Sequence, residues 1–272
     1  IIRVNSKKAD ISYILQEKDV VEVLTSLNFQ PKAVKIKKSV NSNVVQAVKS
    51  SIIFQDQNII ILNKKSGLAV QGGSGISISI DDILPYLKFE NIQNPKLVHR
   101  LDKDTSGILL IARNKDASTL LTSYFKNRRI EKTYIALVKG RLSKEEGKIQ
   151  MPLIKKYQGK NEKVYKDDVL GKEAVTYYKL LQYYPDKDIS AVKVNPITGR
   201  THQIRVHLKE IGHPIIGDFK YGANNTDFTN LNIHHRLYLH SFSINIDDFF
   251  GKSLNISTHD INLVKQNYFF VF

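Results

Sequence analysis

The sequence predicts an α+β protein in which strands outnumber helices. Strand patterns rich in Ile, Val, Leu, Thr and Tyr recur along the chain and are bounded by turn-forming residues. They cover residues 52–62, 108–112, 132–138, 173–181 and 189–194. Helical spacing of apolar residues occurs after Asn114 and again after Thr201. The chain has 272 residues, 42% of them hydrophobic, which is enough for a substantial core in one large or two smaller domains.

The charge of the chain indicates the kind of partner. The 41 Lys and Arg residues exceed the 26 Asp and Glu residues, so the net charge is +15. A charge of this size favours a polyanion, and nucleic acid is the leading candidate because its binding releases counterions. We expect no membrane partner, because the sequence has neither an apolar run of roughly 18 residues nor a clear basic amphipathic helix.

The chain contains no cysteine. This absence excludes a disulfide-linked partner, thiolate zinc sites and cysteine nucleophiles, and it fits a cytoplasmic protein. The sequence shows no apolar region of a secretory signal, and it begins at Ile1 rather than Met.

The first 51 residues form two segments. Residues 1–25 alternate polar and apolar side chains, which predicts two short strands joined by turns and too small to bury a core alone. Such a ribbon either belongs to an RNA-binding module or packs on the main domain. Residues 26–51 are polar, carry four lysines between positions 32 and 38 and show no strong period, which predicts a basic linker. The lysines either follow phosphates or face solvent.

Residues 52–272 begin with a predicted β-hairpin whose turn is residues 55–58. The loop 63–75 follows and is rich in glycine, which permits close approach of a ligand. We therefore expect this loop to lie against a bound molecule. It is not a nucleotide-binding P-loop, because no Gly-Lys-Ser/Thr sequence closes it.

The chemical centre is expected just before the apolar run 108–112. His99, Arg100 and Asp102 stand there within four residues, followed by small turn formers. A reactive group on a loop before a buried strand is held firmly while its side chain stays open to substrate. Asp102 is therefore the candidate catalytic group, and ordinary turn composition is the alternative. A protein-kinase loop is excluded, because Leu101 and Asp102 stand in the opposite order.

The segments after this loop alternate between helix and strand patterns. Asn114 is the expected N-cap of an amphipathic helix. The strand 132–138 carries Tyr134, and a lone tyrosine on a strand more often serves packing than chemistry. Residues 140–172 are rich in lysine and turn formers, which predicts a β-excursion with basic loops.

Residues 199–212 predict a short helix with an apolar stripe at every third or fourth position. Thr201 is the expected N-cap and Gly212 the C-terminal stop. His202 and His207 are five residues apart and therefore lie on different faces of a helix. We expect them to be surface or core histidines rather than a metal-binding pair.

The nine residues from His99 to Gly107 match the central motif of the RluA-type RNA pseudouridine synthases, His-Arg-Leu-Asp-x-x-Thr-Ser-Gly. The resemblance covers about residues 52–272. It includes a Lys-x-x-Gly-Leu element at 64–68, a Lys-x-Tyr element at 132–134, a Gly-Arg-Thr-His-Gln-Ile-Arg element at 199–205 and an Arg-Leu-Tyr-Leu-His element at 236–240.

Two further resemblances concern the substrate. Residues 69–75 are similar to the RluC-like branch, which modifies 23S ribosomal RNA of the large subunit. This branch implies large-subunit ribosomal RNA or its precursor as the partner, with tRNA as the alternative. Residues 1–25 resemble the second half of the alpha-L RNA-binding module, and the helical first half is absent. We therefore expect a truncated, β-rich RNA-binding module followed by a linker and a catalytic domain.

The family resemblance implies an isomerase that converts uridine to pseudouridine and needs no cofactor and no metal. Asp102 would be the catalytic group, acting as a nucleophile or as a base. Arg205 would pair with it, and Tyr134 would stack on the target base. An apolar pocket would raise the pKa of Asp102, whereas the guanidinium would lower it.

The same motifs imply the residues that bind substrate. Ile204 and Leu239 would form walls of the base pocket, and Arg100 would fill the space that the flipped base leaves. The matched motif positions add four further substrate-binding candidates, which are His99, Lys64, Gly67 and Thr105.

The implied fold is a mixed, mainly antiparallel central sheet with surrounding helices and an active site in a basic cleft. We expect a monomer. The alternative function is a catalytically inactive RNA-binding or ribosome-assembly factor that has kept the fold and the charge.

Overall fold

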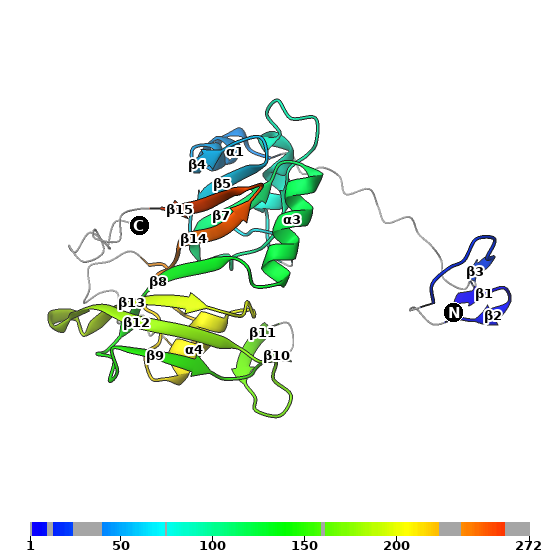
Figure 1. Ribbon diagram of the computed structural model, residues 1–272. Helices are drawn as coiled ribbons and strands as arrows, with labels where there is room; N and C mark the ends of the chain where they lie inside the picture. Colours follow the sequence, from blue (N-terminus) through cyan, green and yellow to red (C-terminus); the bar gives the residue numbers. More distant parts are fainter. Residues whose placement is uncertain are drawn as a thin grey trace. The chain divides into compact units, whose positions relative to one another are not determined.

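The computed structural model describes residues 2–9, 13–23, 40–73, 75–158, 161–222 and 235–258. The chain divides into two compact units, Ile1–Ser39 and Val40–Phe272, shown in Figure 1. The second unit carries the candidate site. Within the described residues, we find no helix with the length and apolar character that a membrane span requires.

The first unit is a small antiparallel sheet. Its strands are β1 (Ile2–Val4), β2 (Lys7–Lys8) and β3 (Val21–Val23), in the order β2-β1-β3. Asn5 and Ser6 join β1 to β2 with positive φ angles of 50° and 64°, the conformation of a tight hairpin turn. The prediction of two strands was thus one strand short, because the two-residue β2 is too brief to show a period.

The second unit is built on a ten-stranded sheet in which β4-β5-β7-β14-β8-β13-β12-β9 follow one another, while β15 pairs with β14 and β6 with β7. The strands are β4 (Ile52–Gln55), β5 (Ile59–Lys64), β6 (Lys96–Leu97), β7 (Ser106–Ala112), β8 (Glu131–Lys139), β9 (Glu146–Gln150), β12 (Val175–Tyr184), β13 (Ile189–Pro196), β14 (Leu239–Phe249) and β15 (Lys252–Ser257). A separate hairpin consists of β10 (Leu153–Gln158) and β11 (Asn161–Lys166).

The sheet is mixed and mainly antiparallel. Among the paired strands described, only β14 and β7 run parallel, and the other pairs are antiparallel. The helices are α1 (Ser42–Lys49), α2 (Ile80–Ile83), α3 (Lys115–Lys126) and α4 (Gln203–Glu210), with 3-10 turns at Leu84–Leu87 and Pro185–Lys187. The expected α+β fold with a mainly antiparallel sheet is confirmed.

Strands β5 and β7 lie at the centre of one half of the sheet and are buried on both faces. Alternate side chains of the two strands enter different cores, as the two-residue period of a strand requires. Ile60 and Leu109 pack with residues of α1 and α2, whereas Ile61 and Leu110 pack with residues of α3 and β14. Figure 1 shows α3 beside β7. This double burial gives the loop before β7 a rigid base.

The C-terminal strand β14 lies between β7 and β8, although β7 and β8 are neighbours in the sequence. The insertion joins the half that contains β5 and β7 to the half that contains β8, β13, β12 and β9. Helix α4 covers this second half, with Ile204 and Leu208 in the same core as Val192 and Val194. Residues from both halves therefore meet near the start of β7.

The expected linker was wrong for its last part. Asn41 caps α1 by accepting a hydrogen bond from the Asn43 N–H at 2.8 Å. Val45 and Val48, one helical turn apart, are buried against the sheet. The second unit therefore begins at Val40 rather than at residue 52, because this short helix completes the core. Residues 26–39, with the four lysines, lie outside the described residues.

The other local predictions have mixed outcomes. The hairpin 52–62 is confirmed by β4 and β5, and Asn114 caps α3 by accepting from the Ala117 N–H. The β-excursion is confirmed by β9, β10 and β11. Gly212 follows α4 with a φ of +88°, as a helix stop requires. Thr201 was the wrong N-cap, because His202 occupies that position.

Candidate active site

Asp102 lies on the loop between β6 and β7. The Thr105 N–H donates to the Asp102 carbonyl at 3.2 Å, which closes a turn just before β7. Gly107 has a φ of +104°, and a Cβ there would collide with the backbone of Ser241 in β14. Glycine is therefore required for β7 to pair with β14, and this pairing fixes the end of the Asp102 loop.

Lys64 holds the Asp102 loop from the side of β5. Its ammonium donates to the carbonyls of Lys65, Leu68 and Lys103 at 3.0, 2.9 and 3.0 Å. Burial lowers the pKa of Lys64 to about 8. The Gly67 N–H donates to the same Lys103 carbonyl at 3.0 Å. Lys64 and Gly67 line a cavity, as expected of binding residues, but these polar groups are engaged with the backbone.

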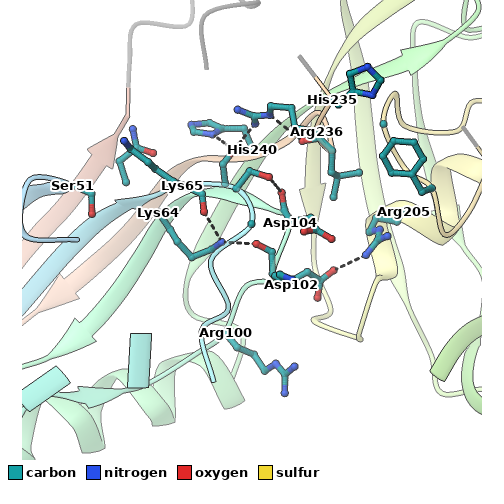
Figure 2. A pocket seen from close by; sticks show the side chains of 18 of the residues that line it. Ser51, Lys64, Lys65, Arg100, Asp102, Asp104, Arg205, His235, Arg236 and His240 are labelled. Atoms are coloured by element: carbon teal, nitrogen blue, oxygen red, sulfur yellow. Dashed lines mark hydrogen bonds and ion pairs between the residues drawn. The ribbon is translucent and has the colours of Figure 1, made fainter. Parts of the chain in front are cut away.

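Arg205 approaches Asp102 from α4, on the opposite side from Lys64 (Figure 2). Its Nη1 lies 3.6 Å from Asp102 Oδ2. Its Nε and Nη2 donate to the two carboxylate oxygens of Asp218 at 2.8 and 2.7 Å. The expected pairing of Arg205 with Asp102 is therefore present, but the two-pronged bond goes to Asp218, whose side chain is 1% exposed.

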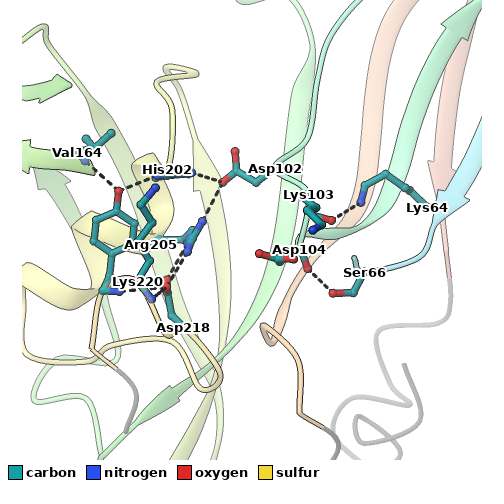
Figure 3. Close-up of polar contacts among 11 residues, drawn as sticks. Lys64, Ser66, Asp102, Lys103, Asp104, Val164, His202, Arg205, Asp218 and Lys220 are labelled. Atoms are coloured by element: carbon teal, nitrogen blue, oxygen red, sulfur yellow. Dashed lines mark hydrogen bonds and ion pairs between the residues drawn. The ribbon is translucent and has the colours of Figure 1, made fainter. Parts of the chain in front are cut away.

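Asp218 and His202 were missed by the sequence analysis as members of this site. His202 Nε2 lies 3.7 Å from Asp102 Oδ2, and its Nδ1 lies 2.7 Å from the Tyr221 hydroxyl (Figure 3). Tyr221 also lies under the Arg205 guanidinium, 5.0 Å from ring centre to Cζ. His202 could have been found from its place in the matched element 199–205, whereas Asp218 and Tyr221 lie in a segment that gave no such signal.

The ionisation of Asp102 reflects two opposing influences. Burial raises the pKa of Asp102, and the Arg205 and Arg100 guanidiniums oppose this rise. The net shift is upward, because burial outweighs the guanidiniums and Asp218 adds a like charge nearby. Burial also raises the pKa of Tyr134 to about 12, so this phenol stays protonated at neutral pH.

Two cavities meet at Asp102. The larger has a volume of about 1030 Å³ and a strongly basic lining that includes Lys64, Lys65, Arg100, Lys103, Lys220 and Arg236. The smaller has a volume of about 110 Å³ and is lined in part by Leu101, Thr105, Tyr134, Ile204 and Leu239. Asp102, Arg100, His202 and Arg205 line both. A polyanion in the larger cavity could therefore insert one flat group beside the Asp102 carboxylate.

Most of the expected site residues line one of these cavities. His99 lines neither of them. Its ring stacks on Phe125 with centroids 4.5 Å apart, and its Nε2 accepts the Leu110 N–H at 2.8 Å. Burial lowers the pKa of His99 to about 3, so the ring stays neutral and can accept this bond. His99 anchors the loop to β7.

Arg236 and His240 form a second polar cluster on the wall of the larger cavity. Arg236 Nη2 donates to Ser106 Oγ at 2.7 Å, and this oxygen lies 2.8 Å from His240 Nδ1. Ser106 is the first residue of β7. The cluster therefore ties the end of the Asp102 loop to β14 as well as to β5.

Comparison with known proteins identifies the class to which this fold and site belong. Residues 58–210 match the model of the RNA pseudouridylate synthase family. The chain belongs to this family and is an isomerase, as the resemblance of its central motif implied.

The similar relatives carry a more specific name. Ribosomal large subunit pseudouridine synthase C of Rickettsia bellii is 39% identical over 260 residues, which cover 94% of this chain and 84% of the relative. The protein of the same name from Haemophilus influenzae is 39% identical over 248 residues, covering 90% and 75%.

Solved structures agree with this family. Human RNA pseudouridylate synthase domain containing 1 has a TM-score of 0.65 and 26% identity, covering 80% of this chain and 86% of the human one. Human RNA pseudouridylate synthase domain containing 4 shares the fold, with a TM-score of 0.68, 24% identity and coverage of 84% and 96%.

Proposed function

We propose that this enzyme isomerises specific uridines to pseudouridine in 23S ribosomal RNA or its precursor, with Asp102 as the catalytic carboxylate. The observation that carries the proposal is the place of Asp102, at the junction of a basic cavity and a small pocket and 3.6 Å from Arg205. The names of the relatives from Rickettsia bellii and Haemophilus influenzae support the ribosomal substrate.

The proposed reaction exchanges one bond of the base for another. The bond between ribose C1′ and uracil N1 breaks, a bond between C1′ and C5 forms, the C5 proton leaves and N1 gains a proton. Ionised Asp102 begins the exchange, either by attacking the ribose or by removing a ribose proton. Arg205 supports the ionised form. The small pocket holds the detached uracil between Tyr134, Ile204 and Leu239, so that it rotates without leaving.

The target uridine reaches this pocket only if it leaves the RNA stack. Flipping costs a few kcal/mol, which contacts made outside the stack must offset. The basic lining of the larger cavity binds phosphates without reading sequence. We assign the vacated stack to Arg100, and the exposure of its side chain beside both cavities supports this role.

We propose in addition that the N-terminal unit is a partial RNA-binding module. The protein is proposed to be a monomer and to act in the cytoplasm. Arg3, Lys7, Lys8 and Lys18 are exposed on this unit, which supports a contact with phosphates. Light scattering of the purified protein would test whether it is a monomer.

The decisive experiment incubates the protein with 23S ribosomal RNA, its precursor and tRNA and maps new pseudouridines in each. We expect product in large-subunit RNA and none with Asp102→Asn, which should still bind RNA. Asp104→Asn is the matched control, because Asp104 lies on the same loop, and it should remain active. Product in tRNA alone would exclude the ribosomal substrate. RNA binding without product would instead support the inactive assembly factor.

A further inference from the structure

His202 has an unusual place in the active site. It is the N-cap residue of α4, with φ 53° and ψ 18°, a left-handed conformation that is unfavourable for a residue with a Cβ. Its side chain is 12% exposed and borders both cavities together with Asp102. Strained backbone of this kind persists only where surrounding contacts enforce it, and it occurs often at active sites.

Tyr221 selects the tautomer of His202. The Val164 N–H donates to the Tyr221 hydroxyl oxygen at 3.0 Å, and this oxygen lies 2.7 Å from His202 Nδ1. In the part of the chain that the structure describes, the hydrogen-bond acceptor within reach of the Tyr221 hydroxyl proton is His202 Nδ1. A neutral ring whose Nδ1 accepts this proton carries its own proton on Nε2. Figure 3 shows the series of polar contacts that leads from Val164 to His202 and on to Asp102.

The ring is also neutral. Burial, assisted by the Arg205 and Lys220 cations, lowers the pKa of His202 to about 3. A neutral ring with its proton on Nε2 acts toward Asp102 as a hydrogen-bond donor and adds no charge.

The two donors around Asp102 approach the same oxygen. His202 Nε2 lies 3.7 Å from Oδ2, and Arg205 Nη1 lies 3.6 Å from it. These distances exceed a hydrogen bond, and contacts of this kind commonly shorten when substrate binds. Holding Oδ2 from two sides turns Oδ1 toward the substrate.

We propose that His202, fixed in its Nε2–H tautomer by Tyr221, is a positioning residue that holds Asp102 Oδ2 and presents Oδ1 to the target nucleotide. The inference rests on the proposed function of Asp102. It adds a neutral donor to the pairing of Asp102 with Arg205.

The test must separate this donor from the other charges near Asp102. The titratable and charged groups that face Asp102 are Lys64, Arg100, Tyr134, His202, Arg205, Asp218, Lys220 and Tyr221. His202→Ala removes the donor. His202→Gln restores a donor near the position of Nε2. His213→Ala is the matched control, because His213 lies outside both cavities.

We expect His202→Ala to lower kcat on the order of 100-fold with KM little changed, since a small misplacement of a reacting group has this effect. The acidic limb of kcat should move to higher pH, because a carboxylate that loses a donor has a higher pKa. His202→Gln should recover most of kcat and restore the acidic limb to its wild-type pH. Tyr221→Phe keeps the ring under Arg205 and should lower kcat by a smaller factor.

Nitrogen chemical shifts of the His202 ring provide a readout independent of turnover and should show the Nε2–H form. A proton on Nδ1, wild-type kcat in His202→Ala, or equal losses in the Ala and Gln variants with an unmoved acidic limb would each overturn the inference. If the wild-type protein makes no pseudouridine, the proposed function fails first, and the ring tautomer still tests the geometry.

Discussion

At the scale of single residues, the site depends on a guanidinium that two carboxylates share. Arg205 gives its two-pronged bond to Asp218 and a longer contact to Asp102. Asp218 thereby orients the guanidinium, and the weaker hold leaves Asp102 accessible to substrate. A carboxylate locked in the two-pronged bond would be stabilised in its ground state, which slows a nucleophile or base.

Removing the charge of Asp218 should destabilise the fold. Asp218→Asn leaves the buried Arg205 cation with only the longer contact to Asp102, and breaking a buried pair in this way costs about 3–5 kcal/mol of unfolding free energy. Denaturant unfolding would measure the loss. Asp186→Asn, at an exposed position, should leave the unfolding free energy almost unchanged. Equal stability of the two variants would contradict the role of Asp218.

Tyr134 should matter for its ring rather than for its proton. Its pKa of about 12 keeps the phenol protonated, so it cannot serve readily as a base near neutral pH. We expect Tyr134→Ala to reduce turnover by the equivalent of about 1–3 kcal/mol, the worth of one stacking contact, with RNA affinity little changed. Tyr134→Phe should keep most of the activity. A loss confined to RNA affinity would argue against stacking on the target base.

At the scale of elements, the Asp102 loop is held between three strands. Lys64 of β5 donates a hydrogen bond to the backbone of the loop, and Arg236, just before β14, donates one to Ser106. Gly107 of β7 has no side chain, which allows β14 to approach. The apolar runs that form β5 and β7 supply the rigid base for these contacts. The position of the Asp102 carboxylate is therefore set by the order of strands in the sheet.

Substitution of Gly107 should show how closely β7 and β14 pack. Gly107→Ala combines a φ of +104° with a collision against the Ser241 backbone. We expect a loss of at least about 2 kcal/mol, the upper cost of a left-handed residue, together with lower activity. Thermal unfolding would measure it. Gly72→Ala is the matched control, because its Cβ would meet no atom within 4 Å.

The three hydrogen bonds of the Lys64 ammonium predict that kcat depends on pH in the alkaline range. The ammonium loses its proton as the pH rises through about 8, and the neutral amine holds the three carbonyls less firmly. Wild-type kcat should therefore fall above pH 8 as the loop loosens. Lys64→Met should have a lower kcat at every pH and lack this alkaline limb. An unchanged limb in Lys64→Met would assign it to another group.

At the scale of the whole molecule, both compact units present positive charge. The larger cavity of the second unit is basic, and the first unit exposes Arg3, Lys7 and Lys8. Phosphate contacts add affinity for RNA of any sequence and make binding depend on salt.

Neutralising the first unit should weaken RNA binding uniformly. Lys7→Gln combined with Lys8→Gln should lower affinity and reduce the slope of affinity against salt by about 1–2, one for each phosphate that is no longer neutralised. Binding measured at several salt concentrations would test this. Glu17→Gln, also exposed on this unit, should leave the slope unchanged. An unchanged slope in the double variant would remove the first unit from the RNA interface.

Much of the fold could be predicted from local patterns. The run 59–62 indicated a strand of a hairpin and the run 108–112 a buried strand. Both runs are apolar at every position because both faces of β5 and β7 are covered. Asn114 marked the start of α3 because its side-chain oxygen accepts the Ala117 N–H, and Gly212 marked the end of α4 because glycine adopts a positive φ. Helix α1 escaped prediction because eight residues give a weak period, and its stability comes from Val45 and Val48 packing on the sheet.

The charge, the strands and the motif that carries Asp102 follow from the sequence alone, since they depend on residue types and on neighbours along the chain. The partners of Asp102 depend instead on the tertiary structure. His202 lies 100 residues beyond it, and Asp218 and Tyr221, which contact Arg205 and His202, lie further along the chain. They come near Asp102 because β14 inserts between β7 and β8. Contacts of this range follow from the order of strands, which no local pattern encodes.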